Sequence, residues 1–259
     1  MEDNLYDKLK SLTGKFPDKL NILEEQIDVK LQMEYFKHSS KLKKKTDASI
    51  GFTLDDLPDI YAPEHTNESI KEQLIKLASM DDPKAYRIIE DYLKNGRPEL
   101  RDWTLLAQQE SKMLLESSLL DENQIFISTG LGGRGNMLRY FIVIIGEEPH
   151  EFNEFQKNII SSEFSFALKN NQSELEKITF DDNLATLLVL IPFEVPFQKV
   201  FRDAITECNN YGNFLKPNFL VTNVKTLSTQ EIHDFIQHNE LPDSNDFDNL
   251  TLNSESDES

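Results

Sequence analysis

Two long apolar runs constrain the fold of this chain more than any other feature. They cover residues 140–145 and 184–191, and neither contains a charged side chain. A strand that is apolar at every position leaves no face for water, so it belongs inside a sheet that is covered on both faces. The sequence therefore predicts a sheet in which these two runs are the central strands.

The segments around the two runs give an order of secondary structure. We expect strands at 138–145, 177–180, 184–191 and 219–221, with helices at 152–167 and 196–208. Asp181-Asp182-Asn183 is the tight turn between the second and third strands. The order strand, helix, strand, strand, helix, strand is that of the ferredoxin-like fold, whose first and third strands lie in the middle of the sheet.

The two helices of such a fold pack on one face of its sheet. We assign to the buried side of the first helix Phe152, Phe155, Ile159, Ile160, Phe164 and Ala167. The second helix begins at Pro196 and carries apolar residues at helical spacing from Phe197 to Cys208, so this thiol is expected to pack as an apolar group. The other face of the sheet needs a cover. We expect the N-terminal helices to supply it, with a second copy or another protein as the alternatives.

The N-terminal half is predicted to be helical. Residues 1–45 form a helical arm in which Leu20, Leu23, Ile27, Leu31 and Tyr35 share one stripe, and the arm ends in the basic cluster Lys41, Lys43, Lys44 and Lys45. Residues 46–65 are a linker interrupted by Gly51, Pro58 and Pro63.

Residues 66–120 are predicted to be a further helical region. Thr66 or Asn67 caps one helix, Asp82 and Pro83 begin the next, and Gly96 ends it before Pro98 starts another. The helical hairpin from residue 79 resembles one unit of a HEAT-like solenoid, although no second copy follows at a fixed period.

Residues 121–238 are therefore assigned to a ferredoxin-like α+β domain, with an extra strand at Gln124–Ser128 that we expect to form a hairpin with the strand from Leu138. Residues 239–259 contain several Asp and Glu and no Lys or Arg, which is typical of a disordered acidic tail.

The composition narrows the class of partner. A net charge of −19 disfavours nucleic acid and anionic membrane surfaces, and it leaves a protein partner, best matched if basic, or self-association. The single cysteine, the missing secretory leader and the missing run of about 20 apolar residues indicate a cytoplasmic protein.

Gly130-Leu131-Gly132-Gly133-Arg134-Gly135 matches the dinucleotide-binding pattern G-x-G-x-x-G. We reject that interpretation, because the pattern must open into a helix and the residues that follow are predicted to form a strand. The kinase interpretation fails as well, since neither H-R-D nor D-F-G occurs. Two alternatives remain, a plain loop that needs positive φ, or a small-anion site. The candidate ligand-binding residues are Gly130, Gly132, Gly133, Arg134, Gly135 and Arg139.

No motif predicts catalysis, a cofactor or a metal. The pair closest to ligand spacing, His233 and His238, has no cysteine near it, and the paired carboxylates fall in predicted turns. We therefore expect a non-enzymatic protein-interaction module that acts as an adaptor, a chaperone-like protein or a regulator. A domain that senses a small anion or phosphometabolite is the first alternative, and an RNA- or ribosome-associated factor is the second.

Overall fold

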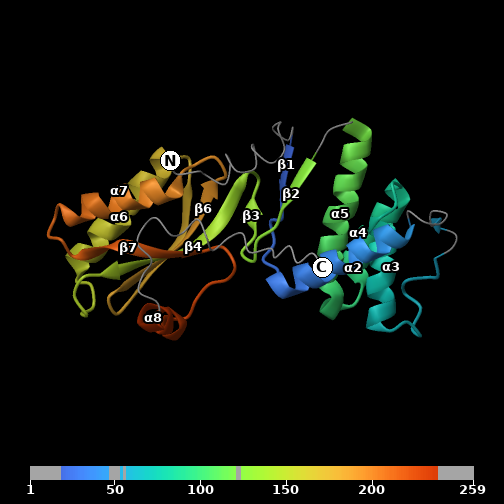
Figure 1. The fold of residues 1–259 in the computed structure, drawn as a ribbon, viewed down its shortest axis with the longest axis horizontal. Coiled ribbons are helices and arrows are strands. Elements are labelled where there is room, and N and C mark those ends of the chain that lie inside the picture. Colours follow the sequence, from blue (N-terminus) through green and yellow to red (C-terminus); the bar gives the residue numbers. More distant parts are fainter. Residues whose placement is uncertain (1–18, 47–52, 55–56, 121–123, 239–259) are drawn as a thin grey trace, which may run out of the picture. The chain divides into compact units, whose positions relative to one another are not determined.

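The computed structural model describes residues 19–46, 53–54, 57–120 and 124–238 (Figure 1). It is a mixed α+β protein with two compact units. The described residues up to Asn136 belong to an N-terminal unit, and those from Met137 belong to a C-terminal unit. Among the described residues, no helix is both long enough and apolar enough to span a bilayer.

The N-terminal unit is mainly helical. Its elements are β1 (Lys19–Ile22), α2 (Val29–Thr46), α3 (Asn67–Ala78), α4 (Pro83–Asn95), the 3-10 helix η2 (Pro98–Leu100), α5 (Arg101–Leu120), β2 (Gln124–Ile127) and β3 (Gly133–Arg134).

Three helix ends in this unit confirm the predicted caps. Thr66 Oγ1 accepts a hydrogen bond from the Ser69 N–H at 3.2 Å, and Asp82 Oδ1 accepts one from the Lys84 N–H at 2.8 Å. At the end of α4, the Gly96 N–H donates to the Tyr92 carbonyl at 2.7 Å. Each bond satisfies a backbone group that the helix leaves unpaired, which is why these local signals place the helices correctly.

Two predictions for this unit are wrong. Residues 19–22 form a strand rather than part of a helix, and α2 begins only at Val29. Strand β1 pairs in parallel with β2, from Lys19 opposite Gln124 to Ile22 opposite Ile127. The segment from Gln124 therefore forms no hairpin with the strand from Leu138, and it belongs to the N-terminal unit. The predicted helix around Leu5–Leu12 and the predicted disordered tail, 239–259, lie outside the described residues.

The core of the N-terminal unit is built around Trp103. Its ring meets the ring of Tyr35 edge to face, with 5.1 Å between centroids, and both side chains are buried. The Tyr35 hydroxyl donates to Glu110 Oε2 at 2.5 Å, and Ser39 donates to Glu110 Oε1 at 2.6 Å. Lys43 lies 2.6 Å from the same carboxylate, so one member of the predicted basic cluster forms an ion pair that joins α2 to α5.

The C-terminal unit is an antiparallel sheet with helices. Its elements are β4 (Met137–Gly146), α6 (Glu154–Asn170), β5 (Glu174–Asp181), β6 (Leu184–Pro192), α7 (Phe197–Asn209), β7 (Leu215–Thr222) and α8 (Thr229–His238). The four long strands follow the order β7-β4-β6-β5, so the two apolar runs are neighbours at the centre, as predicted. Strands β5 and β6 are joined at Asp182 and Asn183, and Asp182 has φ +50°, which confirms the tight turn.

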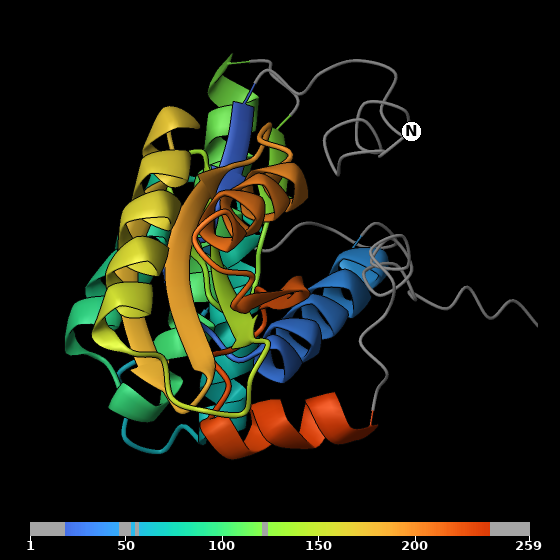
Figure 2. The ribbon, with the colours of Figure 1, turned by 90° about the vertical axis from the view of Figure 1, so that its left-hand side faces the viewer.

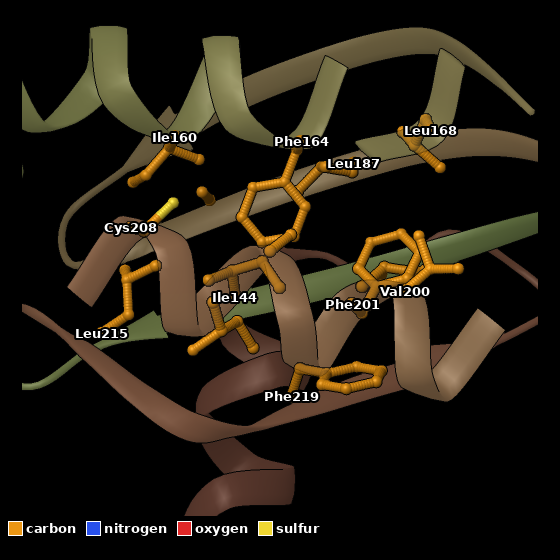
Figure 3. Packing of buried hydrophobic residues seen from close by; sticks show 14 of the residues in the cluster. Ile144, Ile160, Phe164, Leu168, Leu187, Val200, Phe201, Cys208, Leu215 and Phe219 are labelled. Carbon is orange, nitrogen blue, oxygen red and sulfur yellow. The ribbon is translucent and has the colours of Figure 1, made fainter. Parts of the chain in front are cut away.

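Helices α6 and α7 lie side by side on one face of this sheet (Figure 2). Phe164 from α6 and Phe201 from α7 extend into the same core, where their ring centroids are 5.5 Å apart (Figure 3). Alternate residues of the central strands, such as Ile144 and Leu187, complete this core. Cys208 is buried among them, so it packs as predicted.

One assignment on α6 is wrong. Phe155 was expected on the buried side, but its side chain is exposed. About 100° of rotation per residue separates successive side chains, so Phe155 lies half a turn away from Phe164 around the helix. Since Phe164 points into the core, Phe155 faces solvent.

Candidate functional site

The six predicted ligand-binding residues fall in both units. Gly130, Gly132 and Gly133 are buried in the N-terminal unit, where Gly135 and Arg134 are exposed. Arg139 is part of β4 in the C-terminal unit. The loop around Gly132 and the side chain of Arg139 are therefore described separately.

The glycine-rich loop is held by a close backbone contact. Gly132 has φ +68°, and a Cβ atom at this position would lie 2.4 Å from the Glu24 carbonyl oxygen and 2.6 Å from the Glu25 carbonyl oxygen. The Gly133 N–H donates to the same Glu24 carbonyl at 3.3 Å. Only glycine combines the positive φ with so close an approach, so the fold itself explains this residue.

The backbone amide that an anion would use already donates a hydrogen bond to a carboxylate of the chain. The Gly135 N–H donates to Glu24 Oε1 at 3.1 Å. An incoming phosphate or carboxylate must displace Glu24 from this amide, and it meets like-charge repulsion from the displaced side chain. The loop can therefore bind an anion, and in this structure that anion is the Glu24 carboxylate of the same chain.

Arg139 forms a bidentate ion pair within the C-terminal unit. Its Nε donates to Glu176 Oε2 at 2.6 Å and its Nη2 donates to Glu176 Oε1 at 3.0 Å. The side chains of Arg139 and Glu176 are 20% and 23% exposed, and the fork of the guanidinium matches the two carboxylate oxygens. The guanidinium is therefore engaged by the sheet itself, which joins β4 to β5.

The N-terminal unit contains a pocket of about 380 Å³ that sequence reasoning missed. It lies between Leu54, residues 57–61 and the helices α3 and α4. The apolar part of its lining is Leu54, Leu57, Pro58, Ile60, Leu77 and Ile88. Because these residues come from three segments of the chain, no local pattern marks them as a group.

The lining also includes polar side chains. The Tyr61 hydroxyl donates to Asp91 Oδ2 at 2.5 Å, and Asn95 Nδ2 donates to Asp91 Oδ1 at 2.9 Å. Burial and this bond to Asp91 raise the pKa of Tyr61 well above its usual value, so the hydroxyl remains a donor. Gln73 also lines the pocket, is 5% exposed and has its Nε2 3.3 Å from His65 Nε2.

A second candidate surface is the outer face of α6. Phe155 is 64% exposed and Phe166 is 65% exposed. Eleven residues are about three helical turns, so both rings lie on the same side of the helix, roughly 16 Å apart, with the exposed Ser162 between them. The spacing of the two phenylalanines is visible in the sequence, but Phe155 was predicted to be buried and no prediction was made for Phe166.

Two further observations concern nucleophilic and metal chemistry. Burial raises the pKa of the Cys208 thiol to about 12, so at neutral pH it is a protonated, packed group rather than a nucleophile. Within the part of the chain that the structure describes, no three His, Cys, Asp or Glu side chains are grouped so as to hold a metal ion.

Comparison with known proteins gives no family. No protein-family model matches the sequence, and no protein of curated function matches it. One solved structure with partial similarity is the crystal structure of a "putative transposase" from Deinococcus radiodurans R1. It is 15% identical, with a TM-score of 0.34 over 39% of this chain and 90% of that one. A similarity at this level supports no conclusion about fold or activity.

Proposed function

We propose that this chain is a non-enzymatic protein-interaction module that binds a partner through the outer face of α6. The observation that supports this function is the pair of exposed phenylalanines, Phe155 and Phe166, on one side of one helix. A single exposed apolar residue is common on protein surfaces, whereas two large aromatic rings in line on a helix are typical of a contact surface.

The energetic reason lies in the area that the two rings leave in water. Full burial of a phenylalanine side chain contributes about 1.5–3 kcal/mol. Since each ring is about two-thirds exposed, burial of both in a partner offers roughly 2–4 kcal/mol before the costs of association. Ser162 is small and lies between the rings, so a partner backbone can approach the helix there.

The charge of the chain indicates the chemistry of the partner. The net charge is −19, and the exposed carboxylates of Glu151 and Glu154 lie beside Phe155 in sequence. Self-association brings two such chains together and is opposed by repulsion. A partner with two apolar pockets and a basic rim meets no such repulsion, and the attraction between opposite charges also raises its association rate.

We also infer that the C-terminal unit has the ferredoxin-like fold. Two observations support this inference. The strand order β7-β4-β6-β5 is the order in which that fold arranges its four strands, and both helices lie on one face of the sheet. The mutual packing of α3, α4 and α5 is compatible with a HEAT-like unit, and this analogy adds nothing to the functional proposal.

The two alternatives have weaker support. A small-anion site at the glycine-rich loop requires that the ligand replace the Glu24 carboxylate at the Gly135 amide. RNA association requires a surface that tolerates phosphates, which the acidic excess disfavours.

A photo-crosslinking experiment tests the proposal. A benzoylphenylalanine residue at Ser162, between the two rings, is irradiated in lysate of the source organism, and the adducts are identified by mass spectrometry. We expect a protein adduct that disappears when Phe155 and Phe166 are both changed to Ala and that persists when the exposed Tyr211 is changed to Ala. An adduct that survives the double substitution, or no adduct at all, would contradict the proposed surface.

A further inference from the structure

The pocket of the N-terminal unit is independent of the α6 surface, and its lining is specific enough to define a ligand. Its volume, about 380 Å³, is near the lower end of the range for small-molecule sites, roughly 300–1,000 Å³. We propose that this pocket binds a small amphiphile that has an apolar body and a cationic head group.

The apolar lining specifies the body of the ligand. Leu77 and Ile60 are buried in the core of the unit, and Ile88 is partly exposed beside them. These three side chains come from different segments, so the pocket has apolar walls on more than one side. An alkyl chain or a single aromatic ring replaces water there, which is the main favourable contribution to binding.

The charged side chains at the pocket specify the head group. Asp59 and Asp91 are both part of the lining, and Arg87 is its one basic member among the described residues. The guanidinium of Arg87 lies 2.7 Å from Glu90 Oε2, so its charge is matched by a carboxylate of its own helix. The balance of charge is therefore negative, and it favours a cation over a neutral or anionic head.

Gln73 is the buried polar member of the lining. It is 5% exposed, and its Nε2 lies 3.3 Å from His65 Nε2. Because the His65 ring engages this nitrogen, the amide is satisfied within the unit, and the body of the ligand can be apolar.

A matched series of probes tests the inference on the full-length protein. The probes are 4-phenylbutylamine, 4-phenylbutanol and 4-phenylbutanoate, which share one body and differ in the charge of the head. Binding is followed by the methyl NMR signals of Leu77 and Ile88 during titration. We expect saturable shifts and affinities in the order amine, alcohol, carboxylate, with about fivefold for each step, because one charge near a solvent-accessible carboxylate contributes about 1 kcal/mol.

The substitution Asp91→Asn separates the charge from the shape of the pocket. Asparagine removes the negative charge and keeps an oxygen that accepts from Tyr61, although it gives up the second bond, which Asn95 donates. We expect it to weaken the amine about fivefold and to leave the alcohol unchanged. Absence of saturable shifts, equal affinities for the three probes, or tightest binding of the carboxylate would each overturn the inference, the last because it would make Arg87 the partner of the head group.

Discussion

Replacement of Gly132 by alanine tests whether the glycine-rich loop is built by its contact with Glu24. Gly135 is a matched control in the same loop. Their φ angles are +68° and +60°, so alanine incurs a similar cost of left-handed backbone at both positions, roughly 1–2 kcal/mol. The two positions differ in space, because a Cβ at Gly135 meets nothing within 4 Å, whereas a Cβ at Gly132 meets backbone.

The magnitude of the difference follows from the distances. A Cβ at Gly132 lies 2.4 Å from the Glu24 oxygen, and an ordinary contact begins at 3.4 Å. The oxygen must therefore retreat, and its bond to the Gly133 N–H is already 3.3 Å long. Loss of that bond costs about 1 kcal/mol and overpacking costs about 1–3 kcal/mol. We expect Gly132→Ala to lower the free energy of unfolding by about 2–4 kcal/mol more than Gly135→Ala.

The single tryptophan gives a direct assay. Trp103 is 1% exposed in the core of the N-terminal unit, so its fluorescence in urea reports the unfolding of that unit. The two variants and the wild type are compared at one protein concentration, with midpoints converted through a shared slope. A difference between the two variants below about 0.5 kcal/mol would show that the contact with Glu24 does not govern the loop, and would refute the reasoning.

Three further perturbations test other contacts. Glu110→Ala removes the acceptor of the buried Tyr35 hydroxyl and should cost the N-terminal unit about 2–4 kcal/mol in the same fluorescence assay; unchanged stability would contradict the network. In a double-mutant cycle, Arg139→Ala and Glu176→Ala should show a coupling of about 0.5–1.5 kcal/mol by circular dichroism in urea, and zero coupling would mean that the bidentate pair is not formed. Burial raises the pKa of Cys208 to about 12, above the unfolded value of about 8.5, so the folded state binds more protons between these values. The C-terminal unit should then lose up to about 1.4 kcal/mol per pH unit above pH 9 in urea titrations, and a profile that is equally steep in Cys208→Ala would assign the loss to another group.

The sequence predicts most reliably where the cause of a structure is local. The caps at Thr66 and Asp82 are correct because one side-chain oxygen satisfies a backbone N–H two or three residues away. The turn at Asp182 is equally local. The central strands are correct for a related reason, since apolar runs without a charged side chain, here 140–145 and 184–191, have no place at a solvated edge.

Strand β1 shows where local reasoning fails. Leu20, Leu23 and Ile27 have helical spacing, yet residues 19–22 pair with residues 124–127. The backbone partners of this strand are more than a hundred residues away, and no signal near Lys19 indicates them. For so short an apolar segment, periodicity does not distinguish a helix from a strand, and the distant pairing decides.

The same limit applies to the candidate sites. The letters of the glycine-rich loop suggested an anion site, whereas Glu24, the residue that meets its amides, lies far away in sequence. The pocket was not predicted for the same reason, because its walls come from three segments of the chain. By contrast, the pair Phe155 and Phe166 was visible in the sequence, because their separation of about three turns fixes a common face; the prediction was wrong only in placing Phe155 on the buried side with Phe164.

The chain contains one probe for each proposed binding event, and this makes the two proposals separable. Trp103 is in the unit with the pocket, and Cys208 is in the unit with the α6 surface. A ligand that binds only the folded pocket raises the unfolding free energy of its unit by about 2.7 kcal/mol at a concentration one hundred times its Kd. That increase is seen in tryptophan fluorescence, whereas a partner on α6 slows the labelling of the buried Cys208 thiol, since labelling requires its unit to open. A response of one probe alone therefore assigns the binding event to one unit, and a response of both to a single ligand would show that the two units unfold as one.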